Sequence, residues 1–279
     1  MTGGAAETVE RLLGVGVHRV SGRSPARVEL DDGRTVVAKN GAADPGSVPA
    51  EAAGLRWLAV PDGPPVPDVL ADHDEWLVTT LVPSGSPSSD AAADLGRRLA
   101  ALHANGADAF GSAPPGGPEL AWIGRARMRN VPTDRTWAEW YATDRIEPYV
   151  RAAGGQLDTA VFDDVMNRLP ELAGPDEPPA RLHGDLWSGN VLWSPDGAWL
   201  VDPAAHGGHR ETDLAMLDLF GLPHLATVLA AYDETAPLAD GWRTRVPLHQ
   251  LFPLLVHTVL FGGGYAGQAD AAARAALRT

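Results

Sequence analysis

Two polar residues in one short segment have the types and the spacing needed to act on a hydroxyl group beside a metal ion. Asp185 precedes Asn190 by five residues within HGDLWSGN, residues 183–190. One loop can therefore present a carboxylate that orients a hydroxyl and takes its proton, and an amide oxygen that binds a hard cation such as Mg²⁺. Asp202 follows the next apolar stretch and offers a carboxylate as a second ligand for that cation.

The H-x-D-x-x-x-x-N spacing that starts at His183 is that of the catalytic loop of kinases. Residues 191–201 predict a β-hairpin, because the Ser-Pro-Asp-Gly turn at 194–197 separates two short apolar strands. The hairpin ends at Asp202, where a kinase has the aspartate that holds Mg²⁺ against the nucleotide phosphates. The segment therefore predicts phosphoryl transfer to a hydroxyl group.

Lys39 is the only lysine in a chain whose lysines and arginines together number 22. It ends the strand-like run 35–39, which is similar to the lysine-bearing strand of kinases. Because the chain otherwise uses arginine for positive charge, its single lysine indicates a position that requires a compact ammonium and that a planar guanidinium does not fill. Glu51 stands near the start of a helix predicted over 47–58, with Ser47 as the expected N-cap, and we expect it to pair with Lys39 at the nucleotide phosphates.

The first part of the chain predicts a small antiparallel sheet. A short helix over 7–13 is followed by strand-like alternation over 17–39, with turns at 20–26 and 31–34. The turn at 20–26 is the candidate phosphate-covering loop, but it contains one glycine and no G-x-G-x-x-G. It therefore favours an ordinary hairpin turn.

A last apolar strand, 76–82, runs into the connector Pro-Ser-Gly-Ser-Pro, a change of composition that is typical of a hinge. We therefore expect an N-lobe, residues 1–82, and a C-lobe, residues 83–279. If the chain is a kinase, adenine is bound by the backbone of three hinge residues. These are Thr80, Leu81 and Val82.

The rest of the chain is predicted to be mainly helical. His103 lies one turn after Leu99 and is expected to be a buried, hydrogen-bonded core residue. Arg125, Arg127 and Arg129 alternate, as in a solvent-exposed edge. The predicted helices are 91–103, 137–150, 157–172, 213–220, 225–232, 247–261 and 268–277.

Composition excludes several classes of protein. The formal net charge of −14 leaves no basic footprint for nucleic acid, and an acidic surface instead tolerates or attracts cationic small molecules. The absence of cysteine excludes disulfides, cysteine-ligated zinc and thiol catalysis. We find neither a signal peptide nor an apolar run long enough to cross a membrane, so we expect a cytoplasmic protein that does not bind membranes.

Beyond the general kinase signature, more specific segments resemble the fructosamine kinase family, within the aminoglycoside phosphotransferase and protein-kinase-like group. The resemblance covers nearly the whole chain and is thin in the N-lobe. It implies an α+β, bilobal protein-kinase-like fold, with a small antiparallel-sheet N-lobe and a larger, mainly helical C-lobe. The matching segments are HGDLWSGN, VDPAAHGGHRETDLAM (201–216), LFG (219–221), Phe110-Gly111, Trp122-Ile123-Gly124, Thr136-Trp137, Trp140-Tyr141 and Arg145.

The resemblance implies ATP-dependent phosphorylation of the sugar 3-hydroxyl of ketosamines, which are ribulosamine, erythrulosamine or fructosamine adducts of amines. Because the phosphorylated adduct is unstable, the outcome is deglycation. The implied cofactors are ATP and Mg²⁺, and the partners are small or protein-bound glycated amines. We expect a monomer or a weak homodimer. The chain departs from the family at Ala205-His206 and Leu222-Pro223, and it lacks the cysteine that some members use as a redox switch.

The resemblance also implies a role for each matching residue. Asp185 would orient the acceptor hydroxyl and accept its proton, while Asn190 and Asp202 would hold Mg²⁺. His183 and Asp213 would support the catalytic loop rather than react. Contacts to the substrate would come from Trp187, His209, Trp137 and Arg145.

Three other classes of protein remain alternatives. An aminoglycoside, choline or homoserine kinase of the same fold would suit the acidic chain. A catalytically dead binding module of this fold would be expected to lose a residue such as Lys39 or Asp185, which are both present. A metal protein using His206-x-x-His209 has only a weak signal, because no further ligands are evident. A serine hydrolase has no support, since the sequence has no G-x-S-x-G.

Overall fold

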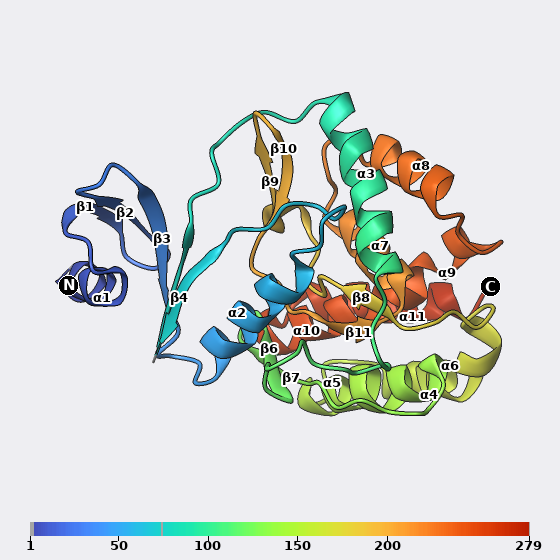
Figure 1. The fold of residues 1–279 in the computed structure, drawn as a ribbon. Helices are drawn as coiled ribbons and strands as arrows, with labels where there is room; N and C mark the ends of the chain where they lie inside the picture. The colour runs from blue at the N-terminus through green and yellow to red at the C-terminus, as the bar shows by residue number, and fades with distance from the viewer. Residues whose placement is uncertain (1–2, 74, 279) are drawn as a thin grey trace.

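The computed structural model describes residues 3–73 and 75–278, and the α+β class expected from the sequence is confirmed. The N-terminal part forms a five-stranded antiparallel sheet in the order β1-β2-β3-β5-β4. Figure 1 shows this sheet and α1 at one end of the molecule and most helices at the other. The elements of this part are α1 (Gly3–Leu13), β1 (Val17–Gly22), β2 (Ala26–Leu30), β3 (Thr35–Asn40), α2 (Ser47–Leu58), β4 (Val69–His73) and β5 (Trp76–Thr80).

The sheet is covered by a different helix on each face, because successive side chains along its strands point to opposite faces. Val28, Val36 and Val78 point to one face and pack against Val9 of α1. Leu77, the neighbour of Val78 on β5, points to the other face and joins the core that contains α2. The second core also includes residues of α3 (Ser89–Ala104), α7 (Arg210–Leu219), α8 (Leu225–Thr235) and the hairpin of β9 (Val191–Ser194) and β10 (Gly197–Leu200), so it ties the sheet to the rest of the chain.

The second part of the chain is mainly helical, as expected, with three small two-stranded sheets. In Figure 1, α2 and the β9–β10 hairpin lie between the large sheet and the helices. The elements are α3 (Ser89–Ala104), β6 (Leu120–Ile123), β7 (Ala126–Arg129), α4 (Trp137–Trp140), a π-helical turn (Tyr141–Ile146), α5 (Glu147–Ala152), α6 (Thr159–Leu172), β8 (Ala180–Leu182), a 3₁₀ turn (Ser188–Asn190), β9 (Val191–Ser194), β10 (Gly197–Leu200), β11 (His206–Gly208), α7 (Arg210–Leu219), α8 (Leu225–Thr235), α9 (Trp242–His249), α10 (Leu251–Phe261) and α11 (Gly264–Ala276).

Some local expectations were wrong. The N-cap of α2 is Gly46 rather than Ser47, because the chain enters the helix with a left-handed φ of 93° that glycine adopts without strain. The helix expected over 247–261 is two helices that meet at Gln250. Strand β4 and the β6–β7 hairpin were not predicted, since each is short and stabilised by its pairing partner rather than by local sequence alone.

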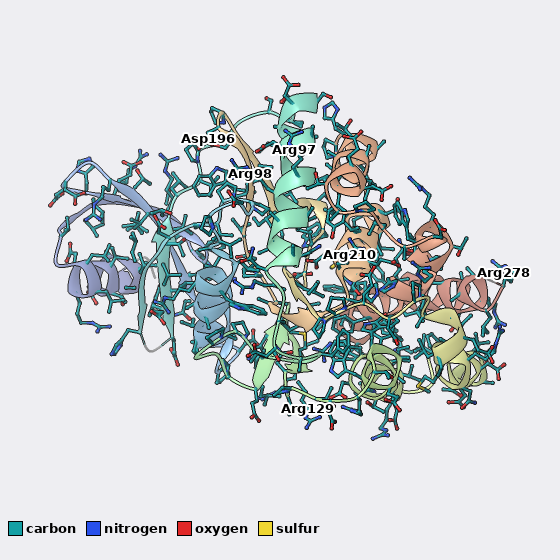
Figure 2. The ribbon with its side chains drawn as sticks, turned by 45° about the vertical axis from the view of Figure 1, so that its right-hand side comes forward. Arg97, Arg98, Arg129, Asp196, Arg210 and Arg278 are labelled. Atoms are coloured by element: carbon teal, nitrogen blue, oxygen red, sulfur yellow. The ribbon has the colours of Figure 1, made fainter. Side chains whose placement is uncertain are left out.

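The arginines of the β6–β7 hairpin lie on a solvent-exposed edge, as expected. Arg125, Arg127 and Arg129 are exposed while Ala126 and Met128 are buried. Figure 2 shows Arg129 at the edge of the molecule, and its guanidinium donates to Asp144 at 2.9 Å. In the described part of the chain, no helix has the length and the hydropathy needed to cross a membrane.

Candidate active site

Asp213 on α7 fixes the backbone of the loop that carries Asp185. Its carboxylate accepts hydrogen bonds from the backbone amides of His183 at 2.8 Å and Gly184 at 2.9 Å. Gly184 has a φ of 81°, and a Cβ there would lie 2.2 Å from the carbonyl oxygen of Ala204. The loop therefore needs glycine at position 184 to make this close approach.

The support of the loop extends into the core through two histidines. His103 is buried, as expected, and its Nε2 lies 3.1 Å from Asp213 while its Nδ1 lies 2.8 Å from the Tyr232 hydroxyl. The Nε2 of His183 lies 3.0 Å from the carbonyl oxygen of Val201, which joins the loop to the end of the hairpin. Burial lowers the pKa of His183, against the attraction of Asp213, so this ring is a neutral brace at physiological pH.

Asn190 holds Asp185 and leaves one atom for a cation. Its Nδ2 donates to the carbonyl oxygen of Asp185 at 2.8 Å, to Oδ2 of Asp185 at 3.1 Å and to the carbonyl oxygen of Asp202 at 3.4 Å. The amide donor is thus used within the loop, and Oδ1 is the atom left to act as a ligand. Burial raises the pKa of Asp185 to about 6, although the hydrogen bond from Asn190 opposes this rise.

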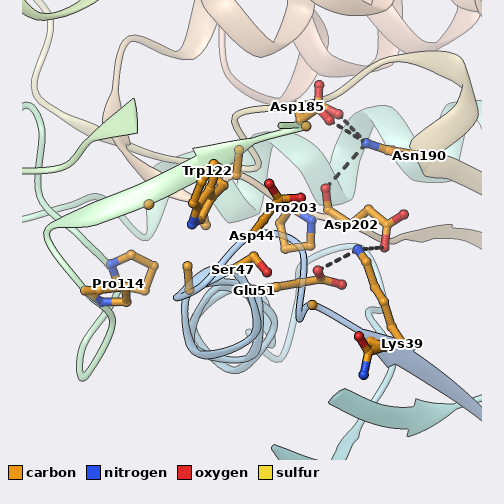
Figure 3. Close-up of a pocket in the computed structure, with 18 of the residues that line it drawn as sticks. Lys39, Asp44, Ser47, Glu51, Pro114, Trp122, Asp185, Asn190, Asp202 and Pro203 are labelled. Atoms are coloured by element: carbon orange, nitrogen blue, oxygen red, sulfur yellow. Dashed lines mark hydrogen bonds and ion pairs between the residues drawn. The ribbon is translucent and has the colours of Figure 1, made fainter. Parts of the chain in front are cut away.

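Lys39 connects the sheet to the hairpin. Its Nζ lies 2.6 Å from Oε2 of Glu51 on α2 and 3.2 Å from Oδ1 of Asp202 (Figure 3). Burial disfavours the ammonium, but the two carboxylates outweigh this effect and raise the pKa of Lys39. The expected pairing of Lys39 with Glu51 is therefore present, and the only lysine of the chain stays charged.

Two cavities meet at Lys39 and Asp202, which line both. The larger, of about 300 Å³, also contains Asp185 and Asn190 and is shown in Figure 3; we call it the acceptor cavity. The other, of about 290 Å³, lies between the sheet and the hairpin. Its apolar lining includes Val37, Leu55, Leu77, Leu192 and Val201, together with the expected hinge residues Thr80, Leu81 and Val82.

The donor set where these cavities meet fits a magnesium ion. Asn190 offers an amide oxygen and Asp202 a carboxylate, and Mg²⁺ prefers such hard oxygen ligands together with water and phosphate oxygens. Asp202 has a left-handed φ of 52°, a conformation that residues with a Cβ seldom adopt. This backbone conformation ends the hairpin and presents the half-exposed Asp202 carboxylate beside Lys39.

Lys39→Arg is expected to lower kcat/KM by about tenfold or more despite preserving the charge. The compact ammonium contacts two carboxylates at once in a half-buried position, and a longer planar guanidinium cannot occupy the same point. Steady-state kinetics with ATP as the varied substrate checks this result. Arg34→Lys, on an exposed turn where Arg34 pairs with Asp32, is the matched control and should keep full activity. Full activity of Lys39→Arg would show that the single lysine has no special role.

Three residues that we expected to contact substrate, Trp137, His209 and Arg145, lie outside the acceptor cavity, and Trp137 and His209 line a separate cavity of about 220 Å³. Trp137 is buried between rings, with its centroid 4.7 Å from those of Tyr141 and His249. His209 is buried and caps α7 by accepting from the amide of Glu211. The Arg145 guanidinium is buried over Trp140, with hydrogen bonds to Asn130 and to the carbonyl of Arg129. Aromatic and arginine side chains at helical spacing here build the core.

Trp187, the fourth residue that we expected to contact substrate, lines the acceptor cavity. Its side chain is partly exposed and meets the ring of Phe220 edge to face, at 5.9 Å between centroids.

The alternative metal site at His206 and His209 is not assembled. Nδ1 of His206 contacts the carbonyl of Ala204 at 2.8 Å. His209 instead lies near Glu211 and His249, whose ligand atoms lie within 4.8 Å of its own. Arg245 occupies both oxygens of Glu211, at 2.5 and 3.0 Å, so this cluster is an ion-pair network of the core.

Several residues of the acceptor cavity were not identified from the sequence. Asp44 comes from the turn before α2, Ser47 is the first residue of α2, and Trp122 comes from β6. Trp122 belonged to a segment that resembles the family, but nothing in the local pattern of Asp44 distinguishes it from an ordinary loop aspartate.

The fold of the chain is of the protein-kinase-like class. An aminoglycoside phosphotransferase in a ternary complex with ADP and hygromycin B superposes with a TM-score of 0.62, covering 97% of this chain and 98% of that one. At 18% identity this likeness establishes the fold alone.

The particular family follows from closer relatives. The sequence model of the fructosamine kinase family matches residues 25–279, so the chain belongs to this family and is a kinase. A protein of Synechocystis sp. described as a probable ketoamine kinase is 36% identical over 241 residues, which are 82% of this chain and 78% of the relative. A crystal structure from Thermobifida fusca YX-ER1, assigned as a fructosamine-3-kinase, is 47% identical with a TM-score of 0.91, over 98% of both chains.

Proposed function

We propose that this enzyme transfers the γ-phosphoryl group of ATP to the sugar 3-hydroxyl of a ketosamine, and that the product decomposes to release the amine. The observation that carries the proposal is the convergence of Asp185, Asn190, Asp202 and Lys39 on one cavity in a chain of this family. The adjoining apolar cavity is the proposed adenine site, with Thr80, Leu81 and Val82 among its lining residues.

In this proposal each side chain has one task. Asp185 accepts a hydrogen bond from the 3-hydroxyl, orients its oxygen towards the phosphorus atom and receives its proton. Lys39, held by Glu51, binds the nucleotide phosphates. Asn190 and Asp202 hold Mg²⁺, which neutralises charge on the phosphate oxygens when bound. Because the transition state is loose, positioning and charge neutralisation supply most of the rate enhancement.

The substrate is assigned by a panel of acceptors. We expect ADP release, with Mg²⁺ and ATP, from ribuloselysine and fructoselysine, and no release above background from kanamycin, choline or homoserine. Nuclear magnetic resonance of the product should locate the phosphate on O3, and free lysine should appear on incubation. Turnover confined to kanamycin or choline would keep the phosphotransferase class and overturn the ketosamine assignment.

A further inference from the structure

The acceptor cavity contains an aspartate that phosphoryl transfer does not use. Asp44 lines the same cavity as Asp185 but comes from the turn before α2. The turn is fixed by its backbone, because the Asp44 amide donates to Gly41 at 2.9 Å and the Asp44 carbonyl accepts from Ser47 at 3.0 Å. Figure 3 shows Asp44 near Trp122 among the side chains that line the cavity.

The Asp44 carboxylate is sheltered from water but weakly paired. Its side chain is 22% exposed, and its ion-pair partner among the described residues is Arg125. The Nε of Arg125 lies 3.6 Å away, beyond a good hydrogen bond, and its side chain is 76% exposed. By contrast, Glu51 and Asp202 both contact Lys39, and Asp185 accepts from Asn190. Asp44 is therefore the carboxylate most available to a cationic ligand.

Trp122 supplies an apolar surface in the same cavity. The Arg127 guanidinium lies over the ring, 4.7 Å from its centroid, and covers part of it. The Nε1 atom is buried without a hydrogen-bond partner, so the ring offers the cavity its carbon atoms rather than a donor. An aromatic ring beside a carboxylate is a suitable environment for an alkylammonium group.

The charges of the cavity also favour a cation. Its lining has the carboxylates of Asp44, Glu51, Asp185 and Asp202 and a single ammonium, that of Lys39. Bound nucleotide adds further negative charge. The substituted amine of a ketosamine is protonated at neutral pH, so it compensates charge that a neutral sugar leaves uncompensated.

We propose that Asp44 and Trp122 form the subsite that recognises the protonated amine of the acceptor. This inference rests on the proposed function. Asp44 pairs with the secondary ammonium on C1 of the sugar, and Trp122 packs against the carbon atoms attached to that nitrogen. The enzyme then selects ketosamines over free ketoses by their charge, while Asp185 acts on the hydroxyl.

The test compares two ligands of nearly equal shape. These are 1-deoxy-1-(propylamino)fructose, which is cationic, and the neutral 1-O-propyl ether of fructose. Calorimetry gives their Kd values in the wild type and in Asp44→Asn with a non-hydrolysable ATP analogue and Mg²⁺ present. We expect Asp44→Asn to weaken binding of the amine about 10- to 100-fold and binding of the ether less than about threefold, because a neutral amide oxygen replaces the charged acceptor of the ammonium's hydrogen bond.

Two further variants sharpen the result. Asp164→Asn makes the same change of charge at an exposed site on α6 and should leave both Kd values unchanged. Arg125→Gln removes the competing guanidinium and should tighten binding of the amine alone. An unchanged preference for the amine in Asp44→Asn, in an enzyme that turns over ketosamines, would overturn this inference and leave the proposed function intact. Absence of ketosamine turnover in the wild type would overturn both.

Discussion

Asp185→Asn is expected to lower kcat by about 10²- to 10⁴-fold, the usual contribution of a positioned general base. Asparagine has the same shape and still accepts a hydrogen bond from Asn190, which lies 3.1 Å from Oδ2 of the aspartate. The proposed adenine cavity is lined by other residues, so the Kd for ATP should change less than about threefold. Single-turnover measurements of ADP formation, with saturating ketosamine, measure the chemical step directly.

The effect of removing one negative charge must be separated from the effect of removing the general base. Asp164→Asn serves again as the exposed control and should retain wild-type kcat. A thermal melt identical to that of the wild type should accompany Asp185→Asn, because the loop is held mainly by Asp213 rather than by Asp185. Undiminished turnover in Asp185→Asn would remove Asp185 from the proposed reaction.

Glu211→Gln is expected to lower the free energy of unfolding by about 3–5 kcal/mol at pH 7, the usual effect of breaking a buried ion pair. Glu211 receives two hydrogen bonds from Arg245, at 2.5 and 3.0 Å, and both side chains are almost fully buried. The variant leaves the Arg245 guanidinium buried without its counter-ion. Urea unfolding of the two proteins measures the difference.

The same variant should change how stability depends on pH. Burial alone would raise the pKa of Glu211, but hydrogen bonds from His249 and Arg245 outweigh it and lower the pKa to about 2. Because its ordinary pKa is 4.5, the unfolded chain takes up this proton first as the pH falls. The stabilisation is therefore complete above about pH 4.5 and is lost progressively towards pH 2.

The stability difference between wild type and Glu211→Gln should accordingly shrink as the pH is lowered from 6 to 3. Glu171→Gln is the matched control, since Glu171 pairs with Arg168 at an exposed site and should show little effect at any pH. A difference that stays constant over this range would mean that Glu211 keeps an ordinary pKa in the folded protein.

The sequence by itself determined the parts of the site that lie on single local elements. Asp185 and Asn190 share one loop, so their separation is fixed within a few residues of chain, and the Ser-Pro-Asp-Gly turn returns the hairpin to Asp202. Lys39 and Glu51 were linked by their positions on a strand and the following helix, and the 2.6 Å contact agrees with that expectation. These spacings are short enough for turn and strand geometry to specify them.

Only the tertiary structure decided which distant side chains share the cavity. Asp44 and Trp122 are brought together by the docking of α2 against the β6–β7 hairpin, whose short strands carry no strong local signal. Trp137 and Arg145 resembled substrate contacts, yet the packing around the π-helical turn places both in the core. Helical spacing shows that side chains share a face, but burial depends on which elements pack against that face.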